Sequence, residues 1–494
     1  MKIKSSLFNS LSGDALLLTF VKVITMSLGL INTRLLSQYL SVYDYGTYSQ
    51  ILLIVSTVSS LTILGMIDGV NFFYSGEADL KKRESYVVTI FTIQCILGAI
   101  VGCGVMMSGT LICQYFDNPD IKRLMIFAAV FPLIQNLTAM SQVLFVAVGK
   151  ARLLAVRNLV ISIVKILVVL MVIYVVNDIA LILTVNLILD IAQIVFFWFI
   201  LVKNGCKFKI TAFDIGLIKR IFRYCIPMAV FLSVNALNRD IDKYLISMMT
   251  DTETLAIYSN ASKQLPFDII MLSFCTVLVP KLTKSISEKK FDDTALLYRK
   301  FLEITYISTG ILCGAAISVA PHLMRLLYSD KYESGLVIFI IYILVDFFRF
   351  TNITLILCAA GKTKLLMVIG LAGLAFNAVT NVLFYNLFGI TGPAIATLLT
   401  TVLLGVMMFV MNGKVLEVKL NAFFSFRNIL MFIVESIALT LGLSYFSSVL
   451  QDSNWNYLVI LFVVAGIYGA VMVMINGKRF IKNMKEMNRM VKKD

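Results

Sequence analysis

Two short segments, VAVGKARLL at residues 146–154 and CAAGKTKLL at residues 358–366, decide how this chain is built. In each segment an apolar stretch ends at a Gly-Lys pair, and a second apolar stretch begins directly after it. Gly149 and Gly361 lie 212 residues apart. A repeat of this period that is carried by apolar segments indicates a bundle of helices that has been doubled.

The composition is that of a membrane protein. The chain is 59% hydrophobic and only 14% charged, with a mean hydropathy of +0.91, whereas a soluble domain carries about a quarter charged residues. Apolar runs of about 20 residues, enough to cross a bilayer core of about 30 Å, recur from end to end. The apolar stretch after Lys4 is too long for a signal peptide and contains Lys22, so we expect the first span to be retained. An all-α polytopic protein with about fourteen spans is therefore predicted, at residues 14–37, 47–68, 86–108, 123–147, 153–175, 179–202, 222–249, 255–280, 302–327, 334–358, 364–386, 390–412, 428–450 and 455–475.

The distribution of Lys and Arg sets the expected orientation, because cytoplasmic loops carry an excess of these residues. With the N-terminus inside, 32 of the 43 basic residues fall in inner segments and four in outer loops. The inner set includes Lys150, Arg152 and Arg157, at the turn after the fourth span and the start of the fifth. Both termini are expected to be cytoplasmic. The net charge of +15 then reflects topology and contact with anionic lipid, and it gives no reason to invoke nucleic acid.

The repeat predicts how the chain is divided. Two six-helix bundles should be followed by a leftover helix pair and a basic end. The expected parts are residues 1–212, 213–414, 415–476 (spans 13 and 14) and 477–494 (a basic cytoplasmic tail).

Cysteine and histidine usage gives no indication of a metal site, a cofactor or an enzyme. The eight cysteines form no C-x-x-C pair, and most lie inside apolar spans, where they pack as small side chains. The single histidine, His322, has no clustered partners for metal binding or acid-base catalysis. The sequence contains no Walker motif for nucleotide hydrolysis.

Residues 381–397 read NVLFYNLFGITGPAIAT. This segment resembles the N-x7-G-x-x-G-A-A-[IV]-A-T signature of Wzx-type oligosaccharide flippases, which are polysaccharide biosynthesis export proteins of the superfamily that includes the MATE drug exporters. Arg34, followed by YGTY at residues 45–48, is similar to the opening pattern of that family. Pro393 stands where the family has Ala, and we expect it to kink the start of its span. Gly389 and Gly392 would permit a tight turn and a close helix approach, although helix packing alone also explains glycines at these positions.

The resemblance implies a flippase that moves a polyprenyl-pyrophosphate-linked oligosaccharide across the bacterial cytoplasmic membrane, for assembly of O-antigen, capsule or exopolysaccharide. Two bundles would alternate access to a site between them, and spans 13 and 14 would contact the prenyl tail. A polysaccharide polymerase is a candidate partner. Two other classes stay open: a MATE-type cation-coupled exporter of drugs or metabolites, and a membrane glycan polymerase. The embedded charges tend to be basic, which disfavours the first, and the outer loops are short, which disfavours the second.

Polar residues inside the spans are the candidates for cargo binding, because a charge at mid-span costs about 2.5–3.5 kcal/mol and normally faces a wet cavity or a partner. Cations suit a pyrophosphate. The predicted substrate-binding residues come from spans 1, 7 and 8: Lys22, Asn235, Asn238, Arg239, Asp242 and Lys263. A structural pair between Arg239 and Asp242, with Lys22 snorkelling to the interface, is the alternative. Lys165, Asp190, Asp346 and Arg349 are weaker candidates, and the last two have the spacing of a local pair.

Coupling to an ion would need a carboxylate near the cleft. Asp68, Asp240 and Asp242 are the available candidates. A proton and a sodium ion fit equally well, because the spacing of these residues does not separate an ion site from a structural pair.

The C-terminal tail carries apolar residues at helical spacing among many lysines and arginines. Phe480, Met484, Met487 and Val491 recur at i, i+4, i+7 and i+11. The pattern predicts either a short amphipathic helix on the anionic leaflet or a disordered basic tail.

Overall fold

A computed structural model describes residues 2–77, 79–175, 178–203, 210–352 and 354–492. Within these ranges the chain forms α-helices and short 3-10 helices without any strand, so the predicted all-α fold is confirmed. Contacts divide the chain into two units, Met1–Ala256 and Ile257–Asp494. This boundary falls later than residue 212, and the helix expected to open the second bundle belongs to the first unit by its contacts. The division at 212 that the repeat suggests stays a prediction.

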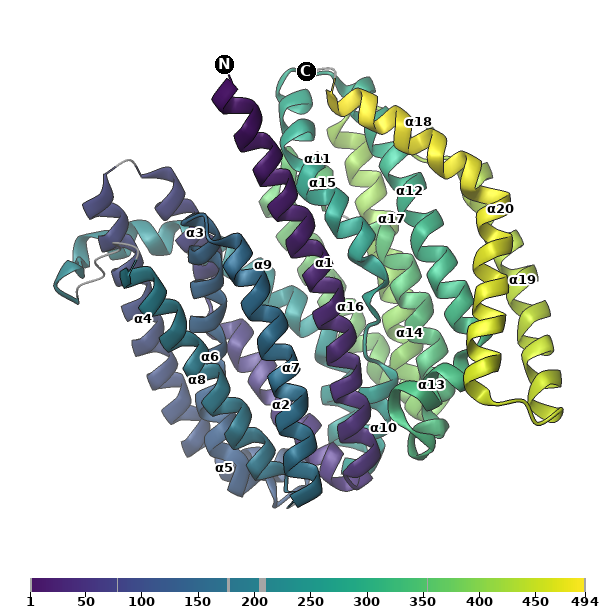
Figure 1. The fold of residues 1–494 in the computed structure, drawn as a ribbon, viewed down its shortest axis with the longest axis horizontal. Helices are drawn as coiled ribbons and strands as arrows, with labels where there is room; N and C mark the ends of the chain where they lie inside the picture. Colours follow the sequence, from purple (N-terminus) through teal and green to yellow (C-terminus); the bar gives the residue numbers. More distant parts are fainter. Residues whose placement is uncertain (1, 78, 176–177, 204–209, 353, 493–494) are drawn as a thin grey trace. The chain divides into compact units, whose positions relative to one another are not determined.

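The first unit is built around α6, which packs against α2, α4 and α8, while α1 packs along α7 (Figure 1). Aromatic side chains fill its core: Phe73 stacks on Tyr86 with ring centroids 4.5 Å apart, and Phe145 meets Phe197 at 4.7 Å. The helices of this unit are α1 (Lys2–Tyr39), α2 (Val42–Thr62), α3 (Met66–Gly76), α4 (Leu80–Met107), α5 (Gly109–Phe116), α6 (Ile121–Ala147), α7 (Ala151–Val175), α8 (Ile179–Lys203), η1 (Ile210–Ala212) and α9 (Ile215–Met249). The next helix, α10 (Thr252–Ala261), contains the boundary.

The second unit is built around α12, which packs against α11, α14, α19 and α20. Two glycines permit the close approach, because a Cβ at Gly310 would overlap the ring of Phe432 and one at Gly314 would overlap Tyr468. The helices are η2 (Pro266–Asp268), α11 (Ile269–Ser287), α12 (Phe291–Ser318), α13 (Ala320–Tyr328), η3 (Asp330–Gly335), α14 (Leu336–Phe348), η4 (Arg349–Asn352), α15 (Leu355–Ala359), α16 (Thr363–Phe388), η5 (Gly389–Thr391), α17 (Gly392–Val415), α18 (Leu420–Phe423), α19 (Phe426–Asp452) and α20 (Tyr457–Lys492).

Among the described residues, nine segments are long and apolar enough to cross a membrane, or ten if α2 and α3 form one bent span. One of the nine, Lys364–Val415, contains both α16 and α17. The other predicted spans fall short for visible reasons. Four charged residues in one stretch lower the hydropathy of α9, and a 3-10 turn interrupts both α10–α11 and α14–α15.

Breaks in the helices are the main departure from the predicted spans. The continuous span predicted at 47–68 is wrong, because α2 ends at Thr62 and α3 leaves at a bend of 42°. Leu64 and Gly65 adopt positive φ angles of 44° and 67° between the two helices, which ends the first helix and redirects the chain.

The two Gly-Lys turns have the same geometry, as their sequence echo suggests. Gly149 has φ of 77° and Gly361 has φ of 68°, both left-handed. The Lys150 N–H donates to the carbonyl of Phe145 at 2.9 Å, and the Lys362 N–H donates to the carbonyl of Leu357 at 2.8 Å. This hydrogen bond, together with the one from each glycine N–H, forms the Schellman cap that ends a helix.

The turn between α16 and α17 explains the two glycines of the motif at residues 381–397. Gly389 adopts φ of 60°, and a Cβ at Gly392 would overlap the backbone of Phe384. Both glycines are therefore required by the backbone, as expected for a tight turn beside a close helix approach. The expected kink at Pro393 is wrong, since this proline lies in the first turn of α17, where a missing N–H costs nothing.

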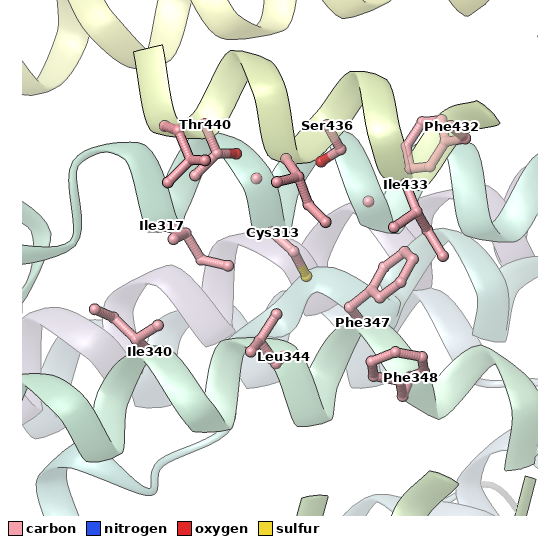
Figure 2. A pocket seen from close by; sticks show the side chains of 14 residues that line it. Cys313, Ile317, Ile340, Leu344, Phe347, Phe348, Phe432, Ile433, Ser436 and Thr440 are labelled. Atoms are coloured by element: carbon pink, nitrogen blue, oxygen red, sulfur yellow. The ribbon is translucent and has the colours of Figure 1, made fainter. Parts of the chain in front are cut away.

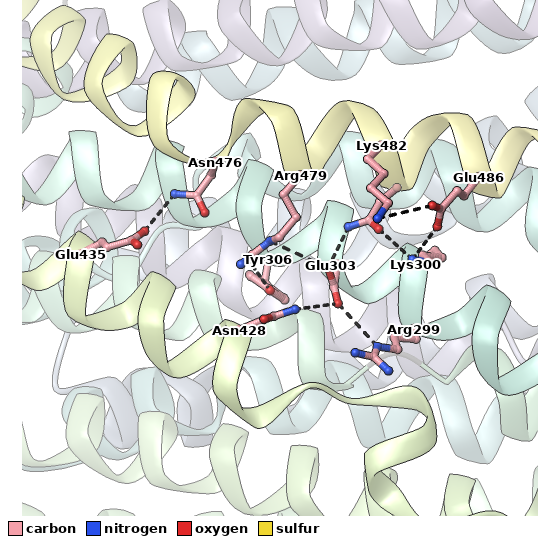
Figure 3. A network of polar contacts seen from close by, with 11 residues as sticks. Arg299, Lys300, Glu303, Tyr306, Asn428, Glu435, Asn476, Arg479, Lys482 and Glu486 are labelled. Carbon is pink, nitrogen blue, oxygen red and sulfur yellow. Dashed lines mark hydrogen bonds and ion pairs between the residues drawn. The ribbon is translucent and has the colours of Figure 1, made fainter.

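The basic tail continues α20 without a break to Lys492 and packs against α12, so it is neither a separate surface helix nor disordered (Figure 3). The anchor is Glu303 of α12. Its carboxylate accepts hydrogen bonds from Asn483 at 2.8 Å and Asn428 at 3.3 Å and pairs with Arg299 at 3.5 Å and Arg479 at 3.8 Å. Buried polar partners, rather than lipid, thus hold the polar face of the tail.

Candidate functional site

A polar cavity lies inside the first unit. It has a volume of about 430 Å³ and is lined by side chains from α1, α6, α7 and α8. Each of these helices contains a segment that is long and apolar enough to cross a membrane. A cavity of this size matches small-molecule sites in proteins, and its polar lining departs from the apolar composition of the helices that form it.

An ion pair spans the cavity. Lys165 of α7 places its Nζ 2.7 Å from Oδ1 of Asp190 on α8, and Gln193 donates to the same oxygen at 2.7 Å. Both charged residues lie near the middle of their helices, where the two charges stabilise each other. These residues were the weaker candidates from the sequence, and the structure brings them together in a lined cavity.

Arg157 also lines the cavity, although the sequence interpretation counted it only among the inner basic residues that set the orientation. It lies within α7, only 9% exposed, with its guanidinium carbon 4.5 Å from the centre of the Phe197 ring. Its Nη1 donates to Oδ1 of Asn158 at 2.5 Å. It lies six residues after the start of α7 at Ala151, inside the span predicted at 153–175.

The remaining polar lining consists of amides and hydroxyls. Gln135, Thr138 and Gln142 lie on one face of α6, at spacings of three and four residues. The substrate-binding residues predicted from the sequence came from spans 1, 7 and 8, and this stripe in span 4 was not among them. A search for amides recurring at helical spacing inside an apolar span would have found it. The other lining groups of this kind are Thr25, Asn158, Ser162 and Gln193.

The charges of α9 form a second cluster, centred on Asp240. Its Oδ1 lies 2.8 Å from Nζ of Lys243, while its Oδ2 lies 3.6 Å from Arg239 and accepts from Ser56 of α2 at 3.1 Å. The i, i+3 pair that the structure shows is therefore Lys243–Asp240, and Arg239 lies beside the same carboxylate. The suggested pair between Arg239 and Asp242 stays a prediction. Asp240 was predicted as a coupling-ion candidate and not as a cargo contact. It faces α2 and is buried there, whereas the side chain of Arg239 is 53% exposed.

The other predicted residues are distributed over both units. In the first unit Lys22 and Asn235 are exposed, Asn238 and Asp68 are half-buried, and Asp242 is buried. Lys263 belongs to the second unit, in the segment between α10 and η2, and is exposed. Lys22 lies one helical turn before Thr25, which lines the polar cavity.

Two weaker candidates have a structural role. Asp346 pairs with Arg349 at 3.4 Å, as their spacing suggested. Its Oδ2 also accepts from the N–H of Leu265 at 3.1 Å. This N–H lies where the span is interrupted before Pro266. The side chain of Asp346 therefore accepts a hydrogen bond from a backbone group that has no partner within a helix.

The second unit contains an apolar pocket of about 320 Å³ between α12, α14 and α19. Figure 2 shows Cys313, Leu344 and Phe347 facing Ile433 and Ser436 of α19. Its lining is almost entirely hydrocarbon and aromatic, in contrast to the polar cavity of the first unit.

A bundle of apolar helices that lines an open, charged cavity fits the architecture of a membrane transporter. The family model described as "Polysaccharide biosynthesis protein" matches residues 34–336. The chain belongs to this family, which confirms the resemblance drawn from its motifs. It is also 29% identical over 202 residues to an uncharacterized membrane protein of Methanocaldococcus jannaschii, a match that covers 41% of this chain and 46% of that protein. The chain thus matches about half the length of this relative.

Solved structures show the same fold. The lipid II flippase MurJ in an inward closed conformation superimposes with a TM-score of 0.73 at 16% identity, over 94% of this chain and all of that one. An inward-facing multidrug resistance MATE family transporter of the MOP superfamily gives 0.65 at 12% identity, covering 82% and 98%. A MOP superfamily transporter from Pyrococcus furiosus, whose title reports a binding pocket of reverse polarity, gives 0.57 at 12% identity, covering 82% and 95%.

Proposed function

We propose that this protein is a flippase for a lipid-linked oligosaccharide, a polyprenyl-pyrophosphate repeat unit destined for surface polysaccharide. The observation that carries the proposal is the open, charged cavity lined by membrane helices in a member of the polysaccharide biosynthesis family. A glycan with a charged headgroup needs polar groups inside the membrane, since lipid provides none. Its amides and hydroxyls suit sugar hydroxyls, and its cations suit an anionic headgroup.

In the proposed mechanism two bundles, residues 1–212 and 213–414, alternate access to the cargo. Lys22, Arg239 and Lys263 contact the pyrophosphate, and Asn235, Asn238 and Asp242 contribute polar contacts. Lys22, Arg239 and Lys263 are exposed, which supports a role in binding, because cargo can reach a cation on an exposed surface. Both termini lie on the cytoplasmic side of a bacterial inner membrane, and a polysaccharide polymerase acts on the product.

Coupling to a proton or sodium ion would use Asp68, Asp240 or Asp242. Asp240 is the strongest of these three, because it is buried and shared by Lys243, Arg239 and Ser56. An ion that binds this carboxylate would compete with Lys243 and with Ser56 of α2, and loss of the Ser56 hydrogen bond would weaken the contact of α9 with α2. Such a contact can couple an ion to a helix movement.

The apolar pocket between α12, α14 and α19 is proposed to receive the prenyl tail (Figure 2). Its aromatic and aliphatic lining fits a branched hydrocarbon, and α19 is span 13, which the family resemblance places near the tail. The pocket contributes affinity without specificity, because burial of hydrocarbon is non-directional.

The test is export of glycan in a flippase-deficient strain supplied with the matching glycan, with membrane levels of the protein measured in parallel. Lys22→Glu and Arg239→Glu should abolish export at normal protein levels, since they place like charges beside the pyrophosphate. Lys284→Glu is the matched control, because this cation is exposed and, among the described residues, pairs only with Glu288 at 3.9 Å. Normal export by both variants would refute cargo contact by these cations. Drug efflux without glycan movement in vesicles would instead support the MATE-type alternative, and lengthening of the glycan would support a polymerase.

A further inference from the structure

Arg157 is buried with part of its hydrogen-bonding capacity unused. Its residue exposure is 9%, yet among the described residues its Nε and Nη2 have no hydrogen-bond partner. Only Nη1 is engaged, by Asn158 at 2.5 Å. A buried guanidinium with two idle nitrogens is costly, because it has lost water without gaining partners.

The charge of Arg157 is only partly compensated within the cavity, where the carboxylate of Asp190 acts on it electrostatically. The carboxylate of Asp190 is bound by Lys165 and Gln193, and Arg157 forms no ion pair in the described part of the chain. Two cations and one carboxylate leave the lining one positive charge in excess. Inside a bundle of membrane helices this excess favours an anionic ligand.

The idle nitrogens have the geometry of an oxyanion receptor. Nε and Nη2 form one edge of the guanidinium, and that edge matches two oxygens of a carboxylate or phosphate. The ring of Phe197, 4.5 Å from the guanidinium carbon, holds the plane of this group. Thr138, whose Oγ1 is buried and likewise has no partner among the described residues, adds a donor on the α6 wall of the cavity.

We infer that the cavity of the first unit binds an oxyanion through the Nε–Nη2 edge of Arg157, with Lys165 as the second cation. Its amides and hydroxyls bind the sugar that carries or adjoins this group. The inference deepens the proposed function and rests on it for the source of the oxyanion. That source is either the pyrophosphate of the carrier lipid or the carboxylate of an acidic sugar.

A binding experiment tests this inference without requiring transport. The full-length protein in nanodiscs is titrated calorimetrically with inorganic pyrophosphate, with methyl glucuronide, and with methyl glucoside as the neutral control. One anion should bind in a salt-sensitive manner and the glucoside at least about tenfold more weakly. Preference for pyrophosphate assigns the site to the carrier, and preference for the glucuronide assigns it to an acidic sugar.

The variants separate the guanidinium edge from its charge. Arg157→Gln should weaken binding of the preferred anion by about ten- to hundredfold. Arg157→Lys keeps the cation and its contact with Phe197 but lacks the edge, and it should lose about tenfold. The matched control is Arg220→Gln, which removes an arginine that lies over the rings of Phe73 and Tyr86 at 5.9 and 5.6 Å, outside the cavity lining.

Failure has a distinct signature. The inference is overturned if the wild-type protein binds neither anion, if Arg157→Lys binds as the wild type does, or if Arg220→Gln causes the same loss. Should Arg157→Gln not fold, Arg157→Lys decides the outcome alone. A wild-type protein that flips lipid-linked glycan in vesicles but fails these titrations would leave the proposed function intact and remove this site.

Discussion

Replacement of Glu303 by alanine should separate the tail of α20 from α12 and destabilise the second unit. The carboxylate, whose side chain is 6% exposed, is shared by Arg299 and Arg479 and by the amides of Asn428 and Asn483. Alanine leaves all four partners without their acceptor. Arg479 keeps its hydrogen bond to the hydroxyl of Tyr306 at 2.6 Å, so part of the local structure persists (Figure 3).

The size of the effect follows from burial. Removal of one partner from a buried ion pair costs about 3–5 kcal/mol. The two arginine side chains are 33% and 26% exposed and recover some hydration, which places the loss near the lower end, about 3 kcal/mol. For a unit of this size that corresponds to a fall in Tm of roughly 6–12 °C. Glu303→Gln, which keeps an acceptor and loses the charge, should fall between alanine and the wild type.

Thermal unfolding of the purified protein measures the loss of stability, and tryptic cleavage after the lysines and arginines of residues 478–492 measures release of the tail. The matched control is Asp330→Ala, which breaks the 2.7 Å pair with Arg325, whose two side chains are 51% and 66% exposed. An exposed pair contributes less than about 1 kcal/mol, so this variant should melt within about 3 °C of the wild type. If Glu303→Ala melts no lower than Asp330→Ala and its tail resists trypsin equally, the reasoning from burial is refuted.

Three further predictions follow from the packing. Asp190→Leu leaves Lys165 unpaired and should lower the membrane level of the protein, whereas the double variant with Lys165→Met should restore the level without restoring export, as immunoblots and the complementation assay would show. Gly392→Ala overlaps the backbone of Phe384 and should cost about 1–3 kcal/mol of stability. Gly442→Ala, in open space on α19, should stabilise the protein by up to about 1 kcal/mol. Thermal melting checks both, since the Tm should fall for the first variant and rise for the second. Truncation after Asn476 removes Asn483 and should lower the Tm about as far as Glu303→Ala does, so an unchanged Tm would contradict the packing of the tail.

The positions of the long helices can be predicted from the sequence, but the breaks within them cannot. Long apolar runs predict α6, α7 and α8 closely, because burial in lipid makes the hydropathy signal strong. The break at Leu64 and Gly65 is invisible to the same reasoning, since the flanking residues are apolar and the chain turns through backbone angles alone. The Gly-Lys turns are the exception, because there a glycine is required by the cap and the sequence shows it.

The candidate site was harder to predict because charge alone does not identify it. Lys165 and Asp190 were visible as embedded charges, but only packing of α7 on α8 shows that they share a cavity. Arg157 was hidden by its position near a helix end, where a basic residue is usually a topology signal. The pair Lys243–Asp240 was not predicted, because the sequence of α9 alone does not show that Asp240 faces α2, which supplies Ser56.

The number of hydrogen-bond and ion-pair partners separates buried charged side chains with a structural role from those that can bind a ligand. Glu303 has four partners within the second unit, and Asp240 has three within the first. Arg157 is as well buried as these carboxylates, yet only one of its nitrogens is engaged. A protein tolerates such an unmatched cation at a cost in stability when a ligand completes it. The same comparison implies that anion binding should raise the Tm of the wild-type protein and leave that of Arg157→Gln unchanged, because only a ligand that binds the folded state stabilises it.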